Sequence, residues 1–483
     1  MTTLPADSDF ISTLHHYIKL ADAFVWGPWL LIPLLLGAGL YLMIGLRFMP
    51  LLYLFPAFRY LWTGRKHEAS HKGELSPFNA LMTSMAATVG VGNIVGVATA
   101  LILGGPGAIF WMWCTAIVGM ATKYCEAFLA VRFRVVTHRG RYVGGPMYYI
   151  RLGLGKKWTW LALLFAFFGA VASFGIGNMT QVNAISTNLE TLLDVPPWAT
   201  GAVVFFLVGA VLVGGLKRIG QVAGVLVPFM ALFYIIFGLT IMIIHYEMIP
   251  TVFQMIFTHA FSPDSVVGGL TGSAILVAMQ YGMARGMFSN EAGMGSAPIA
   301  HATAITNSPV RQGFLGMLDP FLDTIVICTM TAVVILLSGV YVPGAGSGST
   351  LTMTAFGAAL PSIAGFEAGR YMVTLAIVLF AFSTILGWSV YGERCAMFLF
   401  GERISLPFRI LFTLVVPLGA MLELNFIWDT ADLFNGLMAL PNLVALLLLS
   451  PVVFRMTRQY FDDPAHRYRR RRWRFFYQNP PRP

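Results

Sequence analysis

The stretch ATVGVGNIVG, residues 87–96, decides how this chain folds. It lies inside the apolar run 78–103, which is long enough to cross a bilayer because a spanning helix takes about 20 residues. Gly90 and Gly92 weaken the helix, and Asn93 is costly in lipid unless it finds a partner. These residues predict a transmembrane helix that opens at mid-depth. Its unpaired N–H and C=O groups can bind a small charged solute and a cation.

The composition is that of a chain whose surroundings are mostly lipid. Its 483 residues have a mean hydropathy of +0.74, and 57% are hydrophobic while only 11% carry a charge. Soluble domains carry roughly 25% charged residues, so the sequence indicates an all-α polytopic membrane protein. The four cysteines form no CxxC pair and no disulfide framework, and we expect them to be small buried residues.

The apolar runs predict about eleven transmembrane helices. The first, at 25–48, is a leading helix that follows an N-terminal segment, 1–24, which we expect to lie at the membrane interface. The other ten predicted spans lie near 78–104, 107–135, 159–189, 198–215, 219–245, 266–303, 314–341, 371–400, 405–422 and 432–455.

Lys and Arg residues gather in alternate loops between these spans. Neither residue occurs in the other loops, at 187–198, 245–265, 342–369 and 424–434. Because cytoplasmic loops carry the excess of positive charge, the pattern predicts an external N-terminus and a cytoplasmic C-terminus. The segment 456–483 contains RYRRRRWRFF, and we expect a basic cytoplasmic tail that contacts anionic lipid rather than nucleic acid.

The seventh predicted span, 266–303, is too long for one straight helix and contains glycines and a proline near its middle. We interpret it as a second broken helix. The two broken helices are spans two and seven, so they predict two groups of five spans in opposite orientation, 78–245 and 266–455. An inverted repeat of this kind places a substrate site at the bilayer midplane.

The first break supplies candidate groups of both polarities. The amides of Val91 and Gly92 lie at the N-terminal end of the second half-helix, where the dipole favours an anionic group. The carbonyls of Ala86 and Val89, in the first half-helix, would face a cation. Glycines alone are better explained by close helix packing, and Asn93 beside them is what favours a binding site.

The second break contains SNEAGMGSAP at 289–298, in which Ser289 or Asn290 could cap a half-helix that begins near Glu291. An acidic residue there suits the helix dipole, so a structural role for Glu291 has at least as much support as a role in transport. Arg285 is ionisable inside a span, where such residues usually face a cavity or a partner. We predict that it forms a gate, or an ion pair with a carboxylate such as Glu291.

Polar residues in two further spans complete the candidate set. Ser383 and Thr384 could offer hydroxyl oxygens to sodium, although adjacent hydroxyls most often bond to their own helix. Trp388 lies one turn after Thr384 and could form a wall for a small substrate, with core packing as the alternative. Gln181 needs a partner at mid-membrane, which is either a substrate or a neighbouring helix.

Charged residues leave a second coupling mechanism open. Lys123 and Glu126 stand three apart, and we expect an ion pair between them near the cytoplasmic end of their helix. Asp319 and Asp323 could serve ion or proton entry, or could stabilise a helix start. Together with Glu291, these aspartates make proton coupling an alternative to sodium coupling.

Several motifs together resemble those of the alanine or glycine:cation symporter family. They are GGPGAIFWMWCTAIVGM at 104–120, ATVGVGNIVG just before it, GGPMYYI at 144–150 and NEAGMGSAP at 290–298. The resemblance covers most of 25–455. It implies the five-plus-five inverted repeat shared with neurotransmitter:sodium symporters, and a location in the bacterial inner membrane.

The resemblance also implies roles for individual residues. The substrate pocket would comprise Thr88, Val91, Gly92, Asn93, Gln181, Tyr281, Gly282, Met283 and Trp388. The sodium site would comprise carbonyl or hydroxyl oxygens of Ala86, Val89, Phe380, Ser383 and Thr384.

The implied function is sodium-coupled symport of a small neutral amino acid, alanine or glycine, by alternating access, with sodium as the coupling ion and no cofactor. A proton-coupled or a glutamine-preferring transporter is the alternative. An enzyme is not expected, because there is no HExxH motif and Gly-x-Ser-x-Gly occurs only in the loop sequence GAGSG at 344–348. Two broken helices favour gated exchange over a continuous channel.

Overall fold

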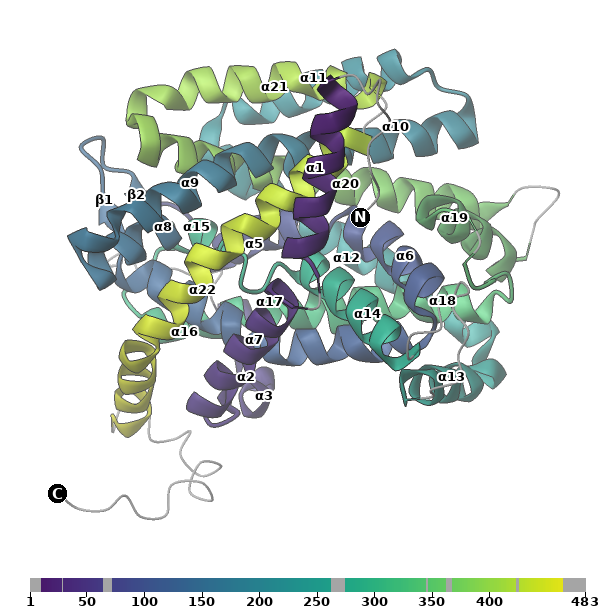
Figure 1. Cartoon of the computed structure of the whole chain (residues 1–483), viewed down its shortest axis with the longest axis horizontal. Helices are drawn as coiled ribbons and strands as arrows, with labels where there is room; N and C mark the ends of the chain where they lie inside the picture. Colours follow the sequence, from purple (N-terminus) through teal and green to yellow (C-terminus); the bar gives the residue numbers. More distant parts are fainter. Residues whose placement is uncertain are drawn as a thin grey trace.

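The structure is a computed structural model, and it describes residues 10–27, 29–63, 72–261, 274–344, 346–361, 367–422 and 425–463. Its regular structure in these residues is helical apart from a short hairpin, in which β1 (Val135–Val136) pairs antiparallel with β2 (Tyr142–Val143). Figure 1 shows the helices packed against one another around a few central ones. The all-α polytopic fold expected from the composition is confirmed.

Each of the eleven predicted spans corresponds to a helix or to a run of helices. Seven continuous helical stretches in the described residues are long and apolar enough to cross a membrane. The leading pass is the shorter apolar helix α2 (Leu31–Gly45). The other uninterrupted passes are α7 (Gly107–Arg132), α11 (Pro197–Leu212), α12 (Gly215–Ile244), α20 (Ala368–Phe400), α21 (Ser405–Met421) and α22 (Asn425–Asp462).

The first predicted break is present. The helix α5 (Pro77–Thr88) ends before a short 3₁₀ turn at Val91–Asn93, and α6 (Val95–Gly104) completes the pass. In a continuous helix the Gly90 amide would donate to Ala86, but here it donates to Asn93 Oδ1 at 2.8 Å. The Asn93 side chain therefore replaces a backbone acceptor and holds the helix open.

The second predicted break is also present, and it is wider than the first. The helices α14 (Ala274–Asn290) and α15 (Ala297–His301) are separated by residues 291–296. Within this segment Glu291, Gly293 and Gly295 have positive φ angles of 51°, 93° and 81°. Since this region strongly favours glycine, the two glycines allow the chain to leave the helix.

The predicted helix start at Glu291 is wrong. The chain resumes a helix only at Ala297, and Glu291 itself lies in the break. The physical reason is a carboxylate from a neighbouring helix. Oε1 of Glu126 on α7 accepts hydrogen bonds from the amides of Gly293 and Gly295 at 3.2 and 3.1 Å, so these amides need no helical partner.

Two other passes contain wide π-helical turns, which often mark functional sites. One lies at 175–179, between α9 (Thr159–Phe174) and α10 (Thr180–Leu193). It contains Gly177, where any β-carbon would clash with Trp388, so the turn and the glycine together let Trp388 pack closely. The other turn, at 321–328, belongs to the pass formed by α16 (Pro309–Gly316), α17 (Leu318–Pro320) and α18 (Thr329–Leu337).

Several helices lie outside the predicted spans. The predicted N-terminal segment contains α1 (Phe10–Val25), which packs against α22 (Figure 1). The remaining connections contain α3 (Met49–Leu52), α4 (Leu54–Thr63), α8 (Pro146–Tyr149), α13 (Ile249–Phe261) and α19 (Gly348–Ala359). The last helix, α22, continues past the predicted end at 455 to Asp462, and the basic sequence at 467–476 lies outside the described residues.

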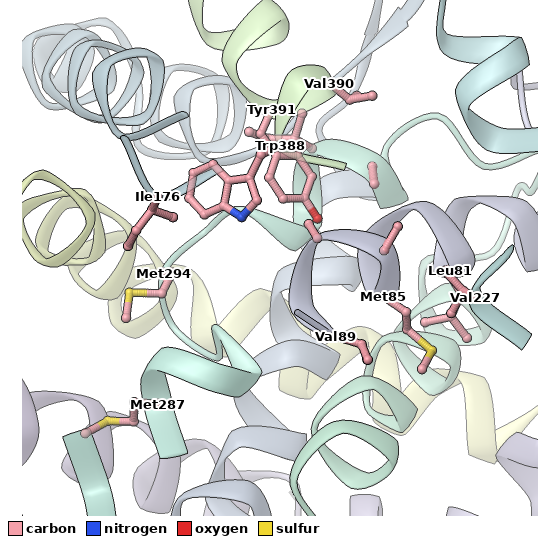
Figure 2. Packing of buried hydrophobic residues seen from close by; sticks show 14 of the residues in the cluster. Leu81, Met85, Val89, Ile176, Val227, Met287, Met294, Trp388, Val390 and Tyr391 are labelled. Carbon is pink, nitrogen blue, oxygen red and sulfur yellow. The ribbon is translucent and has the colours of Figure 1, made fainter. Parts of the chain in front are cut away.

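The core forms where α5 and α20 approach each other. A β-carbon at Gly387 of α20 would lie 2.6 Å from the Ala87 nitrogen of α5, so only glycine allows the two backbones to come this close. On another side of α5, Leu81 and Met85 pack beside Val227 of α12 (Figure 2). This packing fixes the first break against the middle of α20, where the hydroxyl-bearing residues lie.

Candidate functional site

A small central cavity lies between the two broken helices. Its empty volume is about 300 Å³. Its walls come from the two breaks with the helix ends beside them, from the π turn and α10, and from α20 and α22. The lining residues are Ala87, Thr88, Gly90, Val91, Gly92, Ile176, Gln181, Phe288, Ser289, Glu291, Thr384, Trp388 and Asn435. The two interrupted passes therefore meet at one cavity.

The first break presents two backbone N–H groups at this cavity. The amides of Val91 and Gly92 have no hydrogen-bond acceptor among the residues that the structure describes. Both residues line the cavity, and α6 begins just after them. Unpaired amides at the start of a helix form a site for an anionic group, so this end of the cavity suits a carboxylate.

Four oxygen atoms gather where α20 passes the first break. The Ser383 hydroxyl donates to the Phe380 carbonyl at 2.8 Å and lies 3.5 Å from the Val89 carbonyl. The Thr384 hydroxyl makes the same two contacts at 3.0 and 3.5 Å. The long contacts to Val89 leave this carbonyl weakly bonded, and the cluster has the hard oxygen ligands that sodium prefers. These four residues were predicted together, and the structure brings them together.

Ala86, the fifth predicted sodium ligand, is fully buried one turn earlier on α5. Its carbonyl has lost the donor that a continuous helix would give it, because the Gly90 amide bonds to Asn93 instead. Thr88, predicted in the substrate pocket, lines the central cavity and donates to Ser84 O at 3.1 Å and to Asp319 Oδ2 at 3.3 Å.

Asn93 is not among the residues that line the cavity, which differs from the predicted role in substrate binding. Its Nδ2 donates to Asp323 Oδ1 at 2.5 Å, while its Oδ1 accepts from Gly90. Asp323 also accepts from the hydroxyls of Ser289 and Thr324, at 2.9 and 2.7 Å. The amide of Asn93 is thus fully used within the protein, and its role is to shape the break.

Trp388 and Glu291 together form one wall of the cavity. The indole Nε1 of Trp388 donates to Glu291 Oε1 at 3.0 Å, and Ser296 donates to Glu291 Oε2 at 2.5 Å. Figure 2 shows the indole between Ile176 and Tyr391, and the Tyr391 ring lies 5.6 Å from it. Glu291 is therefore bonded to Trp388 and Ser296, and the predicted ion pair between Glu291 and Arg285 is not formed.

Gln181 faces the same cavity from α10. Its Nε2 donates to the Ile176 carbonyl at 3.0 Å, inside the π turn. Its Oε1 is buried and has no hydrogen-bond partner in the described part of the chain. A β-carbon built on Gly90 would lie 3.6 Å from this Oε1, so the free acceptor points toward the first break.

The segment Tyr281–Met283 lies outside the central cavity, contrary to the predicted pocket. Gly282 faces α7, where a β-carbon would clash with the Ala108 carbonyl, and Met283 is buried at 5% exposure. Tyr281 lines a different cavity together with Arg285. The physical reason is the position of the break, since residues nearer the end of α14, such as Phe288, face the central cavity instead.

Comparison with known proteins identifies the family. Residues 11–472 match the sodium:alanine symporter family. The chain belongs to the sodium:alanine symporter family. Such symporters are secondary transporters in the membrane and not enzymes, as the sequence predicted.

Three relatives illustrate the range of this sodium:alanine symporter family. The sodium/alanine symporter AgcS of Methanococcus maripaludis is 46% identical over 460 residues, which cover 94% of this chain and 97% of AgcS. An uncharacterized transporter of Haemophilus influenzae is 48% identical over 93% of this chain and 97% of its own length. The probable sodium/glutamine symporter GlnT of Bacillus subtilis is 39% identical, with coverages of 92% and 91%.

Solved structures of transporters share the fold of this chain. The crystal structure of MhsT in complex with L-phenylalanine has a TM-score of 0.54 at 15% identity and covers 81% of this chain and 99% of that chain. A manganese transporter of Eremococcus coleocola has a TM-score of 0.52 at 13% identity, with coverages of 80% and 82%. At such low identity these likenesses concern the fold alone.

A buried ion pair in this member of the family differs from the predicted one. Lys123 Nζ lies 3.0 Å from Asp319 Oδ2, and both side chains are fully buried. The predicted partner, Glu126, instead bonds to the second break and to Asn442, whose Nδ2 donates to Glu126 Oε1 at 2.7 Å. Spacing along one helix could not reveal this, because the true partner comes from a distant pass.

Apolar residues of the cavity wall were also missed by the sequence analysis. Phe288 and Ile176 both line the central cavity of this transporter. Their sequence neighbourhood gives no usable signal, because phenylalanine and isoleucine occur throughout the apolar spans. Only the packing of α14 and the π turn selects these two residues.

Proposed function

We propose that this protein couples the entry of sodium to the uptake of a small neutral amino acid, alanine or glycine, by alternating access. The observation that gives the strongest support is that groups suited to an anion and groups suited to a cation lie together at the first break. The unpaired amides of Val91 and Gly92 suit a carboxylate, and the oxygen cluster of Val89, Phe380, Ser383 and Thr384 suits a sodium ion.

The shape of the central cavity favours a small substrate. Its empty volume is only about 300 Å³, and bulky apolar side chains form part of its wall. Trp388, Phe288 and Ile176 leave little room beyond a short side chain. The name of the relative GlnT makes glutamine the competing substrate, and the same volume argues against it.

The proposed pose places the amino-acid carboxylate at Val91 and Gly92, and its ammonium group beside Gln181 Oε1. This free, buried acceptor would gain a charged donor, which is a strong kind of hydrogen bond. The side chain of the substrate would then face Trp388 and Phe288. Tyr281, Gly282 and Met283 are not part of this proposed pocket.

The proposed setting is the plasma membrane of a bacterium, with the N-terminus outside and the C-terminus in the cytoplasm. The distribution of Lys and Arg among the loops supports this orientation. The two halves of the repeat would be 78–245 and 266–455, with the breaks at equivalent positions. The basic segment at the end of the chain would contact anionic lipid.

Uptake by proteoliposomes tests the proposed function. We expect labelled L-alanine and glycine to accumulate when sodium is outside, and glutamine to enter poorly. Because a zwitterion and one cation carry a net positive charge, a negative internal potential should increase uptake, by about 2.3 kcal/mol of driving force per 100 mV.

Replacing external sodium with another cation identifies the coupling ion. Equal uptake with choline in place of sodium would show that sodium coupling is wrong. Uptake driven by a pH gradient without sodium would select proton coupling instead, and dominant uptake of glutamine would reject the proposed substrate.

The free acceptor of Gln181 gives a second test of the pose. Gln181→Leu removes Oε1, and we expect affinity for L-alanine to fall by about tenfold, the effect of one hydrogen bond to a charged group. Binding of the labelled amino acid to purified protein in sodium measures this. Thr191→Val, on an exposed face of the same helix, is the control and should bind normally. Unchanged affinity in Gln181→Leu would reject the pose.

A further inference from the structure

A cluster of exposed basic side chains lies in the connection between α7 and α9, and we call it the basic patch. Its four members are Arg132 at the end of α7, Arg151 in the π-helical turn Ile150–Leu154, and Lys156 and Lys157 in the 3₁₀ turn that leads into α9. In the proposed orientation the start of α9 is at the cytoplasmic face of the membrane. The basic patch therefore lies where that helix leaves the bilayer.

Packing brings the members of the basic patch together from separate segments. The Arg132 guanidinium carbon lies 5.3 Å from the centre of the Phe133 ring. A β-carbon at Gly153 would lie 3.2 Å from the same ring and 2.9 Å from Leu449 of α22, so the π-helical turn packs closely against both. At Gly155 the backbone has a φ of 95°, which glycine adopts readily, and the two lysines follow directly. The end of α7 and the start of α9 thus contribute to one patch.

The four cations are not neutralised by the part of the chain that the structure describes. None of them forms an ion pair within 4.0 Å with a carboxylate of the described residues. The sequence has no Asp or Glu between Glu126 and Glu190. Farther along the connection, Arg139 does have a partner, since its Nε lies 3.6 Å from Glu402 Oε2. Exposed cations of one sign favour the approach of an external anion, so the basic patch complements an anionic group.

An exposed apolar stripe continues from the basic patch along α9. Trp158 and Trp160 stack with their ring centroids 6.5 Å apart, and Trp160 is 57% exposed. Leu163, Leu164 and Phe167 are also exposed, and their spacing from Trp160 puts all four on one side of the helix. Tryptophan is enriched at the membrane–water interface, and an exposed apolar stripe on a spanning helix faces lipid chains. The cations and the stripe together match a molecule with an anionic head and apolar tails.

We propose that the basic patch binds the phosphate of an anionic phospholipid such as phosphatidylglycerol, with the acyl chains along the exposed stripe of α9. Clusters of Lys and Arg beside a spanning helix attract anionic lipid on the cytoplasmic side. An acidic protein or a nucleic acid would use the cations but not the stripe, so the two features together favour a lipid. Binding at this patch is separate from the proposed lipid contact of segment 456–483, and it requires the proposed orientation but not the proposed substrate.

Quenching of tryptophan emission by brominated lipids tests this site in the full-length protein. The double variant Trp158→Phe with Trp160→Phe defines the part of the emission that comes from these two rings. In mixed bilayers, brominated phosphatidylglycerol should quench this part at lower lipid fractions than brominated phosphatidylcholine does. Lys156→Gln with Lys157→Gln should reduce this preference by about fivefold for each lysine removed, the contribution of one cation near an anionic surface.

Matched variants separate the basic patch from overall charge. Lys217→Gln with Arg218→Gln removes two exposed cations at the start of α12, on the same side of the membrane in the proposed orientation. This control has the same change of charge and should keep the lipid preference. Lys156→Arg with Lys157→Arg retains both charges and should keep it too. If the double glutamine variant folds poorly, Arg151→Gln replaces it and should lose about fivefold in preference.

Three results would overturn the proposed lipid site. Equal quenching by the two brominated lipids in the unmodified protein would show that the basic patch does not select an anionic headgroup. An equal loss of preference in the control at Lys217 and Arg218 would show that only the overall charge matters. Loss of the preference in inorganic phosphate, but not in sodium chloride of equal ionic strength, would assign the patch to a free anion. Each of these results leaves sodium-driven uptake to be decided by the proteoliposome assay.

Discussion

Lys123→Met should strongly destabilise the folded protein. The lysine ammonium lies 3.0 Å from Asp319, and neither side chain is exposed. Removing one member of a buried ion pair leaves the other charge uncompensated and costs about 3–5 kcal/mol of folding free energy. The thermal unfolding midpoint of the purified protein in detergent measures the loss.

The double variant Lys123→Met with Asp319→Asn separates charge from packing. Since the unpaired carboxylate is then absent, the unfolding midpoint should recover most of the loss. The Ser84 hydroxyl, which donates to Asp319 Oδ2 at 2.9 Å, keeps an acceptor in the asparagine. Lys157→Met, at an exposed lysine, is the control and should not change the midpoint. A double variant as unstable as the single one would contradict the ion-pair explanation.

Ser383→Ala combined with Thr384→Val should abolish the use of sodium at physiological concentrations. These two hydroxyls lie between the carbonyls of Phe380 and Val89 and supply half of the four oxygens in the cluster. If each oxygen contributes as much as a hydrogen bond to a charged group, losing both raises the half-saturating sodium concentration about 100-fold or more. Sodium titration of L-alanine uptake in proteoliposomes measures this shift.

Ser389→Ala is the matched control for the sodium prediction. Ser389 is buried on the same helix, but its hydroxyl donates to the Leu386 carbonyl at 2.6 Å and it does not line the central cavity. Its variant should show the sodium dependence of the unmodified protein. If the double variant behaves like Ser389→Ala, sodium binds elsewhere in the protein.

The sequence was sufficient to predict the membrane passes and the two helix breaks, because both depend on local properties of the chain. Long apolar runs and the distribution of charge predict the spans, and they correspond to the helices in the structure. Gly90 and Asn93 predict the first break through backbone freedom and the need for a hydrogen-bond partner. The second break was located correctly, but its end was misplaced because the Glu126 carboxylate that supports it comes from another helix.

The candidate site was predicted in part, and the errors have a common cause. Ser383 and Thr384 were predicted correctly to lie together at the first break, since both hydroxyls lie 3.5 Å from the Val89 carbonyl. Asn93 bonds to Asp323 rather than lining the central cavity, and Tyr281 lines a different cavity together with Arg285. For a polar residue inside an apolar span, the sequence shows that a partner is needed but not whether the partner is protein or ligand.

By itself, the sequence determined that this protein crosses the membrane many times and that two of its helices are broken, and it predicted that the breaks contain the binding groups. These features follow from side-chain hydrophobicity and backbone preferences, which act over a few residues. Only the tertiary structure decided that Lys123 pairs with Asp319, that Phe288 lines the central cavity, and that Arg285 lies in a different cavity. Such pairings join passes far apart in the chain, and the close packing of helices selects one partner among many of similar chemistry.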